Sequence, residues 1–253
     1  MQMTLISNAA ERIMVALDYA SAEEAQQLMN QLQGIPCWMK VGMQLFYAAG
    51  PGFVAKLKEQ GYKVFLDVKM HDIPNTVKGG SESVTRLGVD MFNVHAAGGA
   101  AMMEAAMEGV DKGLTGSKGS AKPIVIAVTQ LTSTSQSVMN HEIGVPGPVD
   151  ETVIRYAKMT QLAGLQGVVA SPQEVVKIKQ ACGSSFLTVT PGIRPAGSDI
   201  GDQSRIMTPP EAFQQGTDYI VIGRPITGAK DPRQALESIT ESIHSVFQKT
   251  EVI

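Results

Sequence analysis

Three charged side chains follow an apolar run in the segment "FLDVKMHDIPNT", residues 65–76; they are Asp67, Lys69 and Asp72. Charges are costly in a buried strand unless they are paired. Carboxylates on both sides of Lys69 favour its protonated form, which makes it a poor nucleophile but a usable proton donor. An ammonium group placed beside a developing carbanion would stabilise the carbanion and then protonate it.

A carboxylate in the same cluster could act on a substrate carboxylate. Two carboxylates held together raise the energy of the bound ground state, and loss of carbon dioxide relieves it. The alternative is a structural ion-pair network, because Lys40, Asp67, Lys69 and Asp72 sum to zero charge. Buried ion pairs stabilise a fold poorly, since desolvation offsets their attraction, so the pattern favours a functional site.

Eight short apolar runs alternate with amphipathic segments and predict the elements that carry these charges. The expected strands are residues 12–18, 37–42, 63–69, 91–95, 123–129, 167–171, 186–190 and 219–223. Helix-start signals of the capping-box type occur at 21–24, 171–174 and 208–211, and Asp231-Pro232 opens a last helix. This order predicts an α/β fold, a TIM (β/α)8 barrel forming one catalytic domain over residues 1–253. An open doubly wound sheet is the alternative, but no GxGxxG follows the first run.

Side chains alternate along a strand, which places the charges within this barrel. In the third run the aliphatic face consists of Val64, Leu66 and Val68, and the opposite face consists of Phe65, Asp67 and Lys69. In the first run Asp18 shares a face with Met14 and Ala16, and in the second run Lys40 shares a face with Trp38 and Gly42. The charges should therefore converge on the C-terminal rim, where barrel enzymes bind their substrates.

The last run ends in "VIGRPI", which contains Gly223, Arg224 and Pro225. A close backbone approach, a forked guanidinium and a helix start suit a phosphate group; the alternative is an ordinary turn with a surface arginine. Long loops at 130–150 and 191–207 would lie at the same face of the barrel. They offer the Thr132 hydroxyl to a polar ring, and Arg194 and Gln203 to a phosphate or ring.

Composition limits the class of protein. Hydrophobic residues make up 43% and charged residues 18% of the 253 residues, and the net charge is −3, so we expect a globular protein without a nucleic-acid surface. No apolar run approaches the roughly 20 residues of a membrane span, and no signal peptide is apparent, so a cytoplasmic location and no membrane contact are expected.

The two cysteines lack zinc spacing, and His95 has no second histidine at a strand end, so no metal is expected.

The motifs in order resemble the orotidine 5′-phosphate decarboxylase family in its bacterial form. They are "VALD", "MKVGMQLF", "FLDVKMHDIPNTV", "NVHAAGG", "VTQLTS", "GVVASP", "VTPGIRP", "GDQSRI" and "VIGRPI". The resemblance runs essentially end to end, and D-x-K-x-x-D-I-P-N-T is its most specific segment. It implies decarboxylation of orotidine 5′-phosphate to UMP in pyrimidine biosynthesis, no cofactor or metal, and a homodimer with shared sites.

The resemblance also implies residue roles. The catalytic residues it implies are Lys69 as proton donor to carbon 6 of the pyrimidine, Asp67 facing the departing carboxylate, and Asp72 and Lys40 completing the charge network. The substrate-binding residues it implies are Asp18, Lys40, Ile73, Thr76, Thr132, Pro191, Arg194, Gln203, Gly223 and Arg224. In this family Asp72 and Thr76 would reach into the site of the partner subunit.

Two other functions remain open. A Mg²⁺-dependent 3-keto-gulonate 6-phosphate decarboxylase would share the D-x-K-x-x-D pattern, although the "HDIPNT" segment and the "TPGIRP" loop favour a pyrimidine nucleotide. A catalytically silent nucleotide-binding homodimer is the non-enzymatic alternative, and the intact charge set argues against it.

Overall fold

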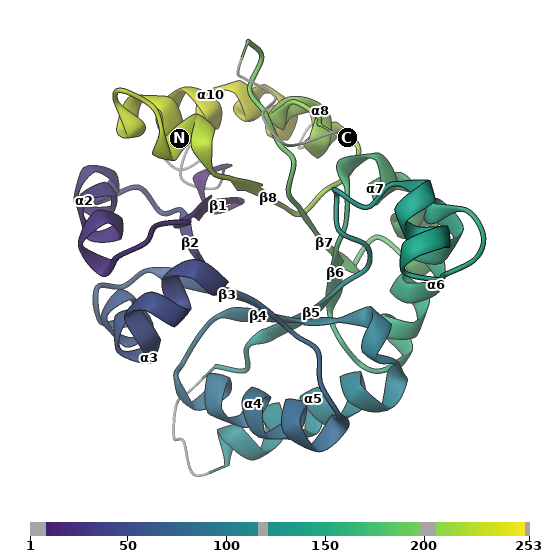
Figure 1. Ribbon diagram of the computed structural model, residues 1–253. Helices are drawn as coiled ribbons and strands as arrows, with labels where there is room; N and C mark the ends of the chain where they lie inside the picture. Colours follow the sequence, from purple (N-terminus) through teal and green to yellow (C-terminus); the bar gives the residue numbers. More distant parts are fainter. Residues whose placement is uncertain (1–8, 116–120, 198–205, 251–253) are drawn as a thin grey trace.

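A computed structural model describes residues 9–115, 121–197 and 206–250 of the chain (Figure 1). In the described residues the strands are β1 (Ile13–Ala16), β2 (Trp38–Gly42), β3 (Lys63–Met70), β4 (Met91–His95), β5 (Ile124–Val128), β6 (Gly167–Val169), β7 (Leu187–Thr190) and β8 (Tyr219–Ile222). The helices are α2 (Ala22–Leu32), α3 (Met43–Glu59), α4 (Pro74–Arg86), α5 (Ala100–Leu114), α6 (Val149–Leu162), α7 (Val175–Cys182), α8 (Pro209–Gln214), α9 (Arg224–Thr227) and α10 (Pro232–Thr250). Short helical turns are η1 (Ala96–Gly98), η2 (Val138–Glu142) and η3 (Pro172–Glu174).

The strands form a closed parallel barrel in chain order, and helices surround it as an outer ring (Figure 1). β1 pairs in parallel with both β2 and β8, which closes the sheet. Each of the eight expected strands is present, so the TIM-barrel prediction is confirmed and the open doubly wound sheet is wrong. No helix in the described ranges is both long and apolar enough to span a membrane.

Two apolar layers confirm the predicted alternation of side chains along β3. Val64 and Leu66 are buried in the layer between strands and helices. Phe65 points the other way, into a cluster inside the barrel that also contains Met14, Trp38, Met91, Ile126 and Val189. The indole N–H of Trp38 donates to the Glu11 carbonyl (3.0 Å). Because Trp38 and Met91 begin their strands, this inner cluster fills the N-terminal half of the barrel and leaves the C-terminal half for a pocket.

The same ion-pair clamp occurs twice, four strands apart, at the N-terminal ends of the strands. Asp90, just before β4, accepts from the Lys58 ammonium (2.5 Å) and from a backbone N–H of β3 (2.7 Å). Asp218, just before β8, accepts from the Lys179 ammonium (2.6 Å) and from a backbone N–H of β7 (2.7 Å). Each carboxylate thus ties a helix to two adjacent strands at the end opposite to the predicted site.

Helix starts follow the expected signals with one difference. Capping boxes are formed at 171–174 and 208–211. At the start of α2, Ser21 Oγ accepts from the Glu24 N–H (3.2 Å), but the Glu24 carboxylate accepts from the N–H of Ala20 instead of closing the box on Ser21. The loop expected at 130–150 also contains the helical turn η2, whereas residues 198–205 of the other long loop lie outside the described residues.

Helices α4 and α5 pack closely because Gly109 on α5 lies against the backbone of α4. A Cβ at Gly109 would lie 2.2 Å from the Lys78 carbonyl oxygen and 2.9 Å from Ser81 Cβ. Gly79 on α4 is exposed, and a Cβ there would meet no atom within 4 Å.

These two glycines give a matched stability test. We expect Gly109→Ala to lower the free energy of unfolding by about 1–3 kcal/mol, because the packed helices must shift. Gly79→Ala should raise it by roughly 0.5–1 kcal/mol, since alanine loses less backbone entropy in a helix. Urea unfolding followed by circular dichroism measures both. Equal effects of the two substitutions would contradict the close packing.

Candidate active site

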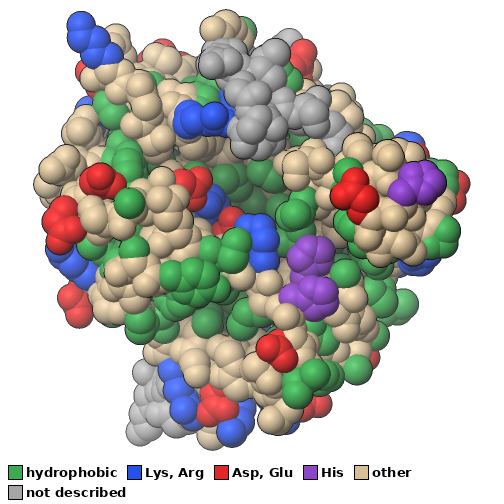
Figure 2. Space-filling model, in the orientation of Figure 1, with side chains coloured by type: hydrophobic (Ala, Val, Ile, Leu, Met, Phe, Trp, Pro, Cys, Tyr) green, Lys and Arg blue, Asp and Glu red, His purple; other side chains and the backbone are tan. Residues whose placement is uncertain are grey.

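A pocket of about 650 Å³ opens at the C-terminal ends of the barrel strands. Figure 2 shows a hollow at the centre of this face, with basic and acidic side chains inside it. The predicted site residues that line it are Asp18, Lys40, Asp67, Lys69, Thr132, Pro191, Arg194, Gly223 and Arg224. They come from β2 and β3 and from the segments after β1, β5, β7 and β8, so the barrel brings together residues that are far apart in the chain.

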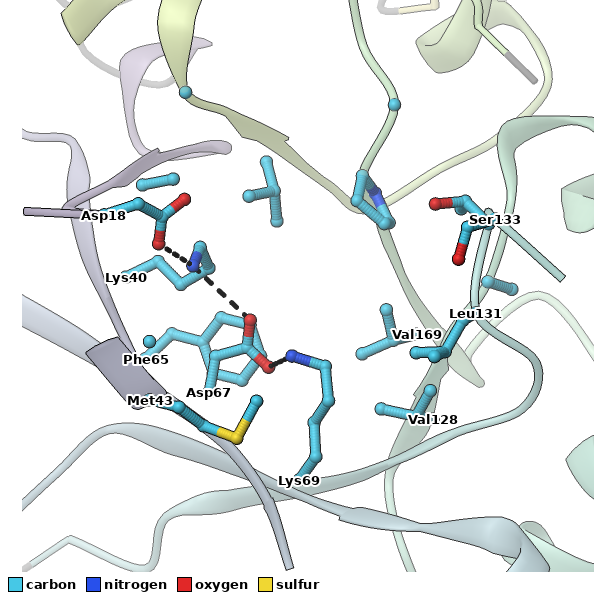
Figure 3. Close-up of a pocket in the computed structure, with 18 of the residues that line it drawn as sticks. Asp18, Lys40, Met43, Phe65, Asp67, Lys69, Val128, Leu131, Ser133 and Val169 are labelled. Atoms are coloured by element: carbon cyan, nitrogen blue, oxygen red, sulfur yellow. Dashed lines mark hydrogen bonds and ion pairs between the residues drawn. The ribbon is translucent and has the colours of Figure 1, made fainter. Parts of the chain in front are cut away.

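Four charged side chains form a chain of ion pairs across one side of this pocket (Figure 3). The Lys40 ammonium lies 3.1 Å from Asp18 Oδ1 and 3.4 Å from Asp67 Oδ2. The Lys69 ammonium donates to Asp67 Oδ1 (2.7 Å). The expected convergence of charges from the first three strands is therefore confirmed, and their signs alternate along the chain of contacts.

Asp67 is the centre of this network, with only 14% of its side chain exposed. Burial by itself raises the pKa of the Asp67 carboxyl, but the ammonium groups of Lys40 and Lys69 oppose it. Hydrogen bonds from Lys69 and Asn93 act in the same direction, and the net result is a pKa below the ordinary value. A carboxylate that stays charged in a partly enclosed pocket is suited to repel a second carboxylate.

The backbone of Lys69 departs from a regular strand. Its φ is +51°, and it is the one non-glycine residue with positive φ in the described chain. The pairing of β3 with β4 shifts here, because three residues lie between Leu66 and Met70 while one lies between their partners Phe92 and Val94. The Lys69 N–H donates to Asn93 Oδ1 (2.8 Å) instead of a strand carbonyl. Simple alternation placed Lys69 on the correct face but did not foresee this irregularity.

Asn93 is the residue at this site that our sequence reasoning missed. It is fully buried in β4, and its Nδ2 donates to Asp67 Oδ1 (2.7 Å). The signal was present in "MFNVH", since Asn93 is a polar residue in a buried strand with the same inward parity as Met91.

Gly42, at the end of β2, leaves room for the first part of the network. A Cβ at this position would lie 3.0 Å from Asp18 Oδ1 and 3.2 Å from Lys40 Nζ. A larger residue would therefore press on the Lys40–Asp18 ion pair.

Two arginines lie on the wall of the pocket formed after β7 and β8. Arg194 is only 8% exposed, and its guanidinium donates to the Ile193 carbonyl (3.0 Å). Arg224 is exposed and begins α9, with Gly223 as the residue before the helix. The short helix that Pro225 was expected to start is present and begins one residue earlier, at Arg224. Gln203 lies outside the described residues.

Three predicted site residues do not line the pocket within one chain: Asp72, Ile73 and Thr76. All three are exposed, and Ile73 has an exposed fraction of 67%. Asp72 Oδ1 accepts a hydrogen bond from the backbone N–H of Ile73 (2.6 Å). The expected addition of Asp72 to the charge network is therefore not found within a single chain.

Two histidines lie beside Lys69. The rings of His71 and His95 stack with their centroids 5.3 Å apart. Burial lowers the pKa of His95, and the charges of His71 and Lys69 lower it further. Within the described ranges, no group of three His, Cys, Asp or Glu side chains is arranged to hold a metal ion.

A closed parallel barrel with charged groups at the C-terminal ends of its strands is the architecture of the barrel enzymes. The family model described as "Orotidine 5'-phosphate decarboxylase / HUMPS family" matches residues 11–239. The chain belongs to this family, and it is an enzyme of the decarboxylase type, a carbon–carbon lyase.

Individual relatives agree with this assignment. Proteins named orotidine 5′-phosphate decarboxylase from Bacillus mycoides and Bacillus cereus are 48% identical over 237 residues, which is 94% of this chain and 99% of theirs. The crystal structure of orotidine 5′-phosphate decarboxylase from Lactobacillus acidophilus is 43% identical, with a TM-score of 0.82, and covers 91% of this chain and 98% of its own. An uncharacterized conserved protein from Geobacillus kaustophilus is 44% identical, with a TM-score of 0.81, over 91% of this chain and 99% of its own.

The lowered pKa of Asp67 predicts how acid affects stability. A carboxylate whose folded pKa is depressed contributes stability above its unfolded pKa of about 3.9, and this is lost as the pH falls through the folded pKa. As the pH falls below about 4, we expect Asp67→Asn to lose less free energy of unfolding than the wild type. Urea titrations across this range measure the difference. Asp111→Asn, which removes an exposed ion pair with Lys122, should follow the wild type; equal acid losses in all three proteins would contradict the prediction.

Proposed function

We propose that the chain converts orotidine 5′-phosphate to UMP and carbon dioxide, without a metal or organic cofactor, and that Lys69 protonates the carbanion-like intermediate. The observation that carries the proposal is the contact of the Lys69 ammonium with the partly buried Asp67 carboxylate in the pocket (2.7 Å). Family membership supports the substrate, because the relatives above are named for this activity.

The chemistry follows from these two side chains. With the substrate carboxylate beside Asp67, the two negative charges repel each other, and cleavage of the carbon–carbon bond releases carbon dioxide. The electron pair stays on carbon 6 of the pyrimidine, where the nearby ammonium lowers the energy of the developing charge. Lys69 then transfers a proton from Nζ to carbon 6, which gives UMP, and a proton from water restores the ammonium.

Other pocket residues have proposed binding roles. The Asp18–Lys40 pair would hold the ribose hydroxyls, because it presents an acceptor and a donor 3.1 Å apart. Thr132 and Pro191 would contact the pyrimidine from the opposite wall of the pocket. These groups would orient the ring so that its carboxylate meets Asp67.

The phosphate would bind between the segments after β7 and β8. Gly223, Arg224 and Arg194 line this wall, and guanidinium groups suit phosphate oxygens. Gln203 is proposed as a further phosphate ligand from the family resemblance alone. Binding a group that does not react can supply the energy that organises the charged site for the transition state.

We further propose a homodimer in which Asp72, Ile73 and Thr76 complete the site of the partner subunit. The support is their position: they lie in the segment after β3 and the first turn of α4, yet they are exposed and do not line their own pocket. A side chain such as Ile73 with 67% exposure beside an active site is better placed in an interface than in water. Met43 and Leu131 add exposed apolar surface at the edge of the pocket.

The reaction can be tested directly. We expect loss of the ultraviolet absorbance of orotidine 5′-phosphate when it is incubated with the protein in the presence of EDTA. Lys69→Ala should lower kcat by at least about 10²–10⁴-fold, since the general acid is removed. Lys63→Ala is the matched control, because Lys63 lies at the other end of the same strand in an ion pair with Glu11, and it should keep full activity.

Three outcomes would count against the proposal. Activity that EDTA abolishes would favour the metal-dependent sugar phosphate decarboxylase. UMP binding without turnover would favour a silent nucleotide-binding protein. Near-normal kcat in Lys69→Ala would remove this residue as the proton donor.

Shared sites predict recovery of activity from two inactive proteins. Lys69→Ala and Asp72→Ala dimers should each be nearly inactive alone. After subunit exchange, about half of the dimers are hybrids with one intact site of two, so about a quarter of wild-type activity should return. The measurement is kcat per subunit after mixing equal amounts. No recovery despite exchange demonstrated by mass spectrometry would contradict a contribution of Asp72 across the interface.

A further inference from the structure

Asn93 connects two parts of the charged site without lining the pocket. Its side chain is fully buried in the middle of β4, facing the inside of the barrel. Its Nδ2 donates to Asp67 Oδ1 (2.7 Å), the oxygen that also accepts from the Lys69 ammonium. Its Oδ1 accepts from the Lys69 backbone N–H (2.8 Å). One amide therefore holds both the carboxylate and the backbone of the neighbouring lysine.

The chemistry of the two contacts requires an amide at this position. The backbone N–H can only donate, and an ionised carboxylate oxygen can only accept. A side chain between them must therefore accept at one end and donate at the other, which an asparagine does and which an ionised aspartate or a leucine of similar size does not. This also fixes the orientation of the amide group.

The contact to the Lys69 N–H matters because of the backbone there. A lysine with φ of +51° is in the left-handed region, which is unfavourable for residues with a Cβ. The shift in pairing between β3 and β4 would leave this N–H without its strand partner. Asn93 supplies the acceptor, so it stabilises the conformation that directs the Lys69 side chain toward Asp67.

We propose that Asn93 is a positioning residue for decarboxylation: it fixes Asp67 and the left-handed backbone of Lys69 so that the ammonium and carboxylate meet in one orientation. The inference rests on the proposed function, since it concerns the transition state of that reaction. Because Asn93 is outside the pocket lining, it acts on kcat and has little effect on substrate affinity.

Steady-state kinetics of Asn93→Leu tests this role. We expect kcat for orotidine 5′-phosphate to fall about 10–100-fold, as for other residues that orient a reacting group, with KM changed less than about threefold. The control is Thr160→Val, which removes a buried hydroxyl bonded to the Tyr156 carbonyl on α6, far from the site. Thr160→Val should lower the free energy of unfolding, as Asn93→Leu does, but keep the wild-type kcat. Equal kcat in both variants, or a loss confined to KM, would overturn the proposal.

The pH dependence of kcat in Asn93→Asp distinguishes a positioning role of Asn93 from a merely structural one. This variant keeps the acceptor for the Lys69 N–H but sets a second carboxylate against Asp67. One of two adjacent carboxyls binds a proton more readily, and the introduced carboxyl, once protonated, can donate to Asp67 as the amide does. The kcat ratio of Asn93→Asp to Asn93→Leu should therefore rise as the pH falls from about 8 to about 6. A constant ratio would contradict the need for a donor at this position.

A crystal structure of Asn93→Leu tests the positioning role of Asn93 without any measurement of activity. We expect Lys69 to leave the left-handed region and the contact between its ammonium and Asp67 Oδ1 to lengthen beyond about 3.5 Å, the outer limit of a hydrogen bond. If the wild type fails to decarboxylate orotidine 5′-phosphate, the proposed function is wrong, but this structure still tests the positioning. An unchanged Lys69 φ and an unchanged contact would overturn it.

Discussion

The site depends on one partly buried carboxylate, that of Asp67. Asp67 accepts from Lys69 and Asn93 through one oxygen and faces the Lys40 ammonium with the other. Its partners stand on the adjacent strands β2 and β4 and further along its own strand, so the parallel barrel supplies them in the correct order. Two lysines this close would repel each other without the carboxylate between them. The charge of Asp67 therefore holds the cationic groups where a negative charge can develop, before any substrate is bound.

The barrel separates the regions that provide stability from the region that provides chemistry. The inner cluster around Trp38 and Phe65 fills the N-terminal half, and the two clamps built on Asp90 and Asp218 tie helices to strand starts at the same end. At the C-terminal end, charged groups face a cavity instead of packing against one another. Such groups are costly for folding, and the well-packed opposite half offsets that cost.

Local pattern was enough to predict most of this architecture. Period-two alternation assigned Val64 and Leu66 to the outer layer and Phe65 to the interior, because each face of a barrel strand meets only one environment. The left-handed backbone at Lys69 was not predictable in this way, since it arises from the register between β3 and β4. Asn93 was not predicted because it carries no charge, and its proposed role depends on two contacts with the neighbouring strand β3. Asp72 lies beyond the end of β3, so its loop and not the strand alternation determines where its side chain lies.

Lys69 lies where a glycine would fit the backbone more easily. Left-handed φ values cost a residue with a Cβ of order 1–2 kcal/mol, and glycine adopts them freely. A glycine here would remove the ammonium that Asp67 binds, so lysine stands at this position against its local conformational preference. Strain of this kind persists only when surrounding contacts determine the conformation. At Lys69 those contacts are the Asn93 acceptor on the backbone and the Asp67 carboxylate on the side chain, which act at opposite ends of the residue. The irregular strand thus sets the direction of the Cα–Cβ bond of Lys69, and the Asp67 carboxylate sets the position of its ammonium.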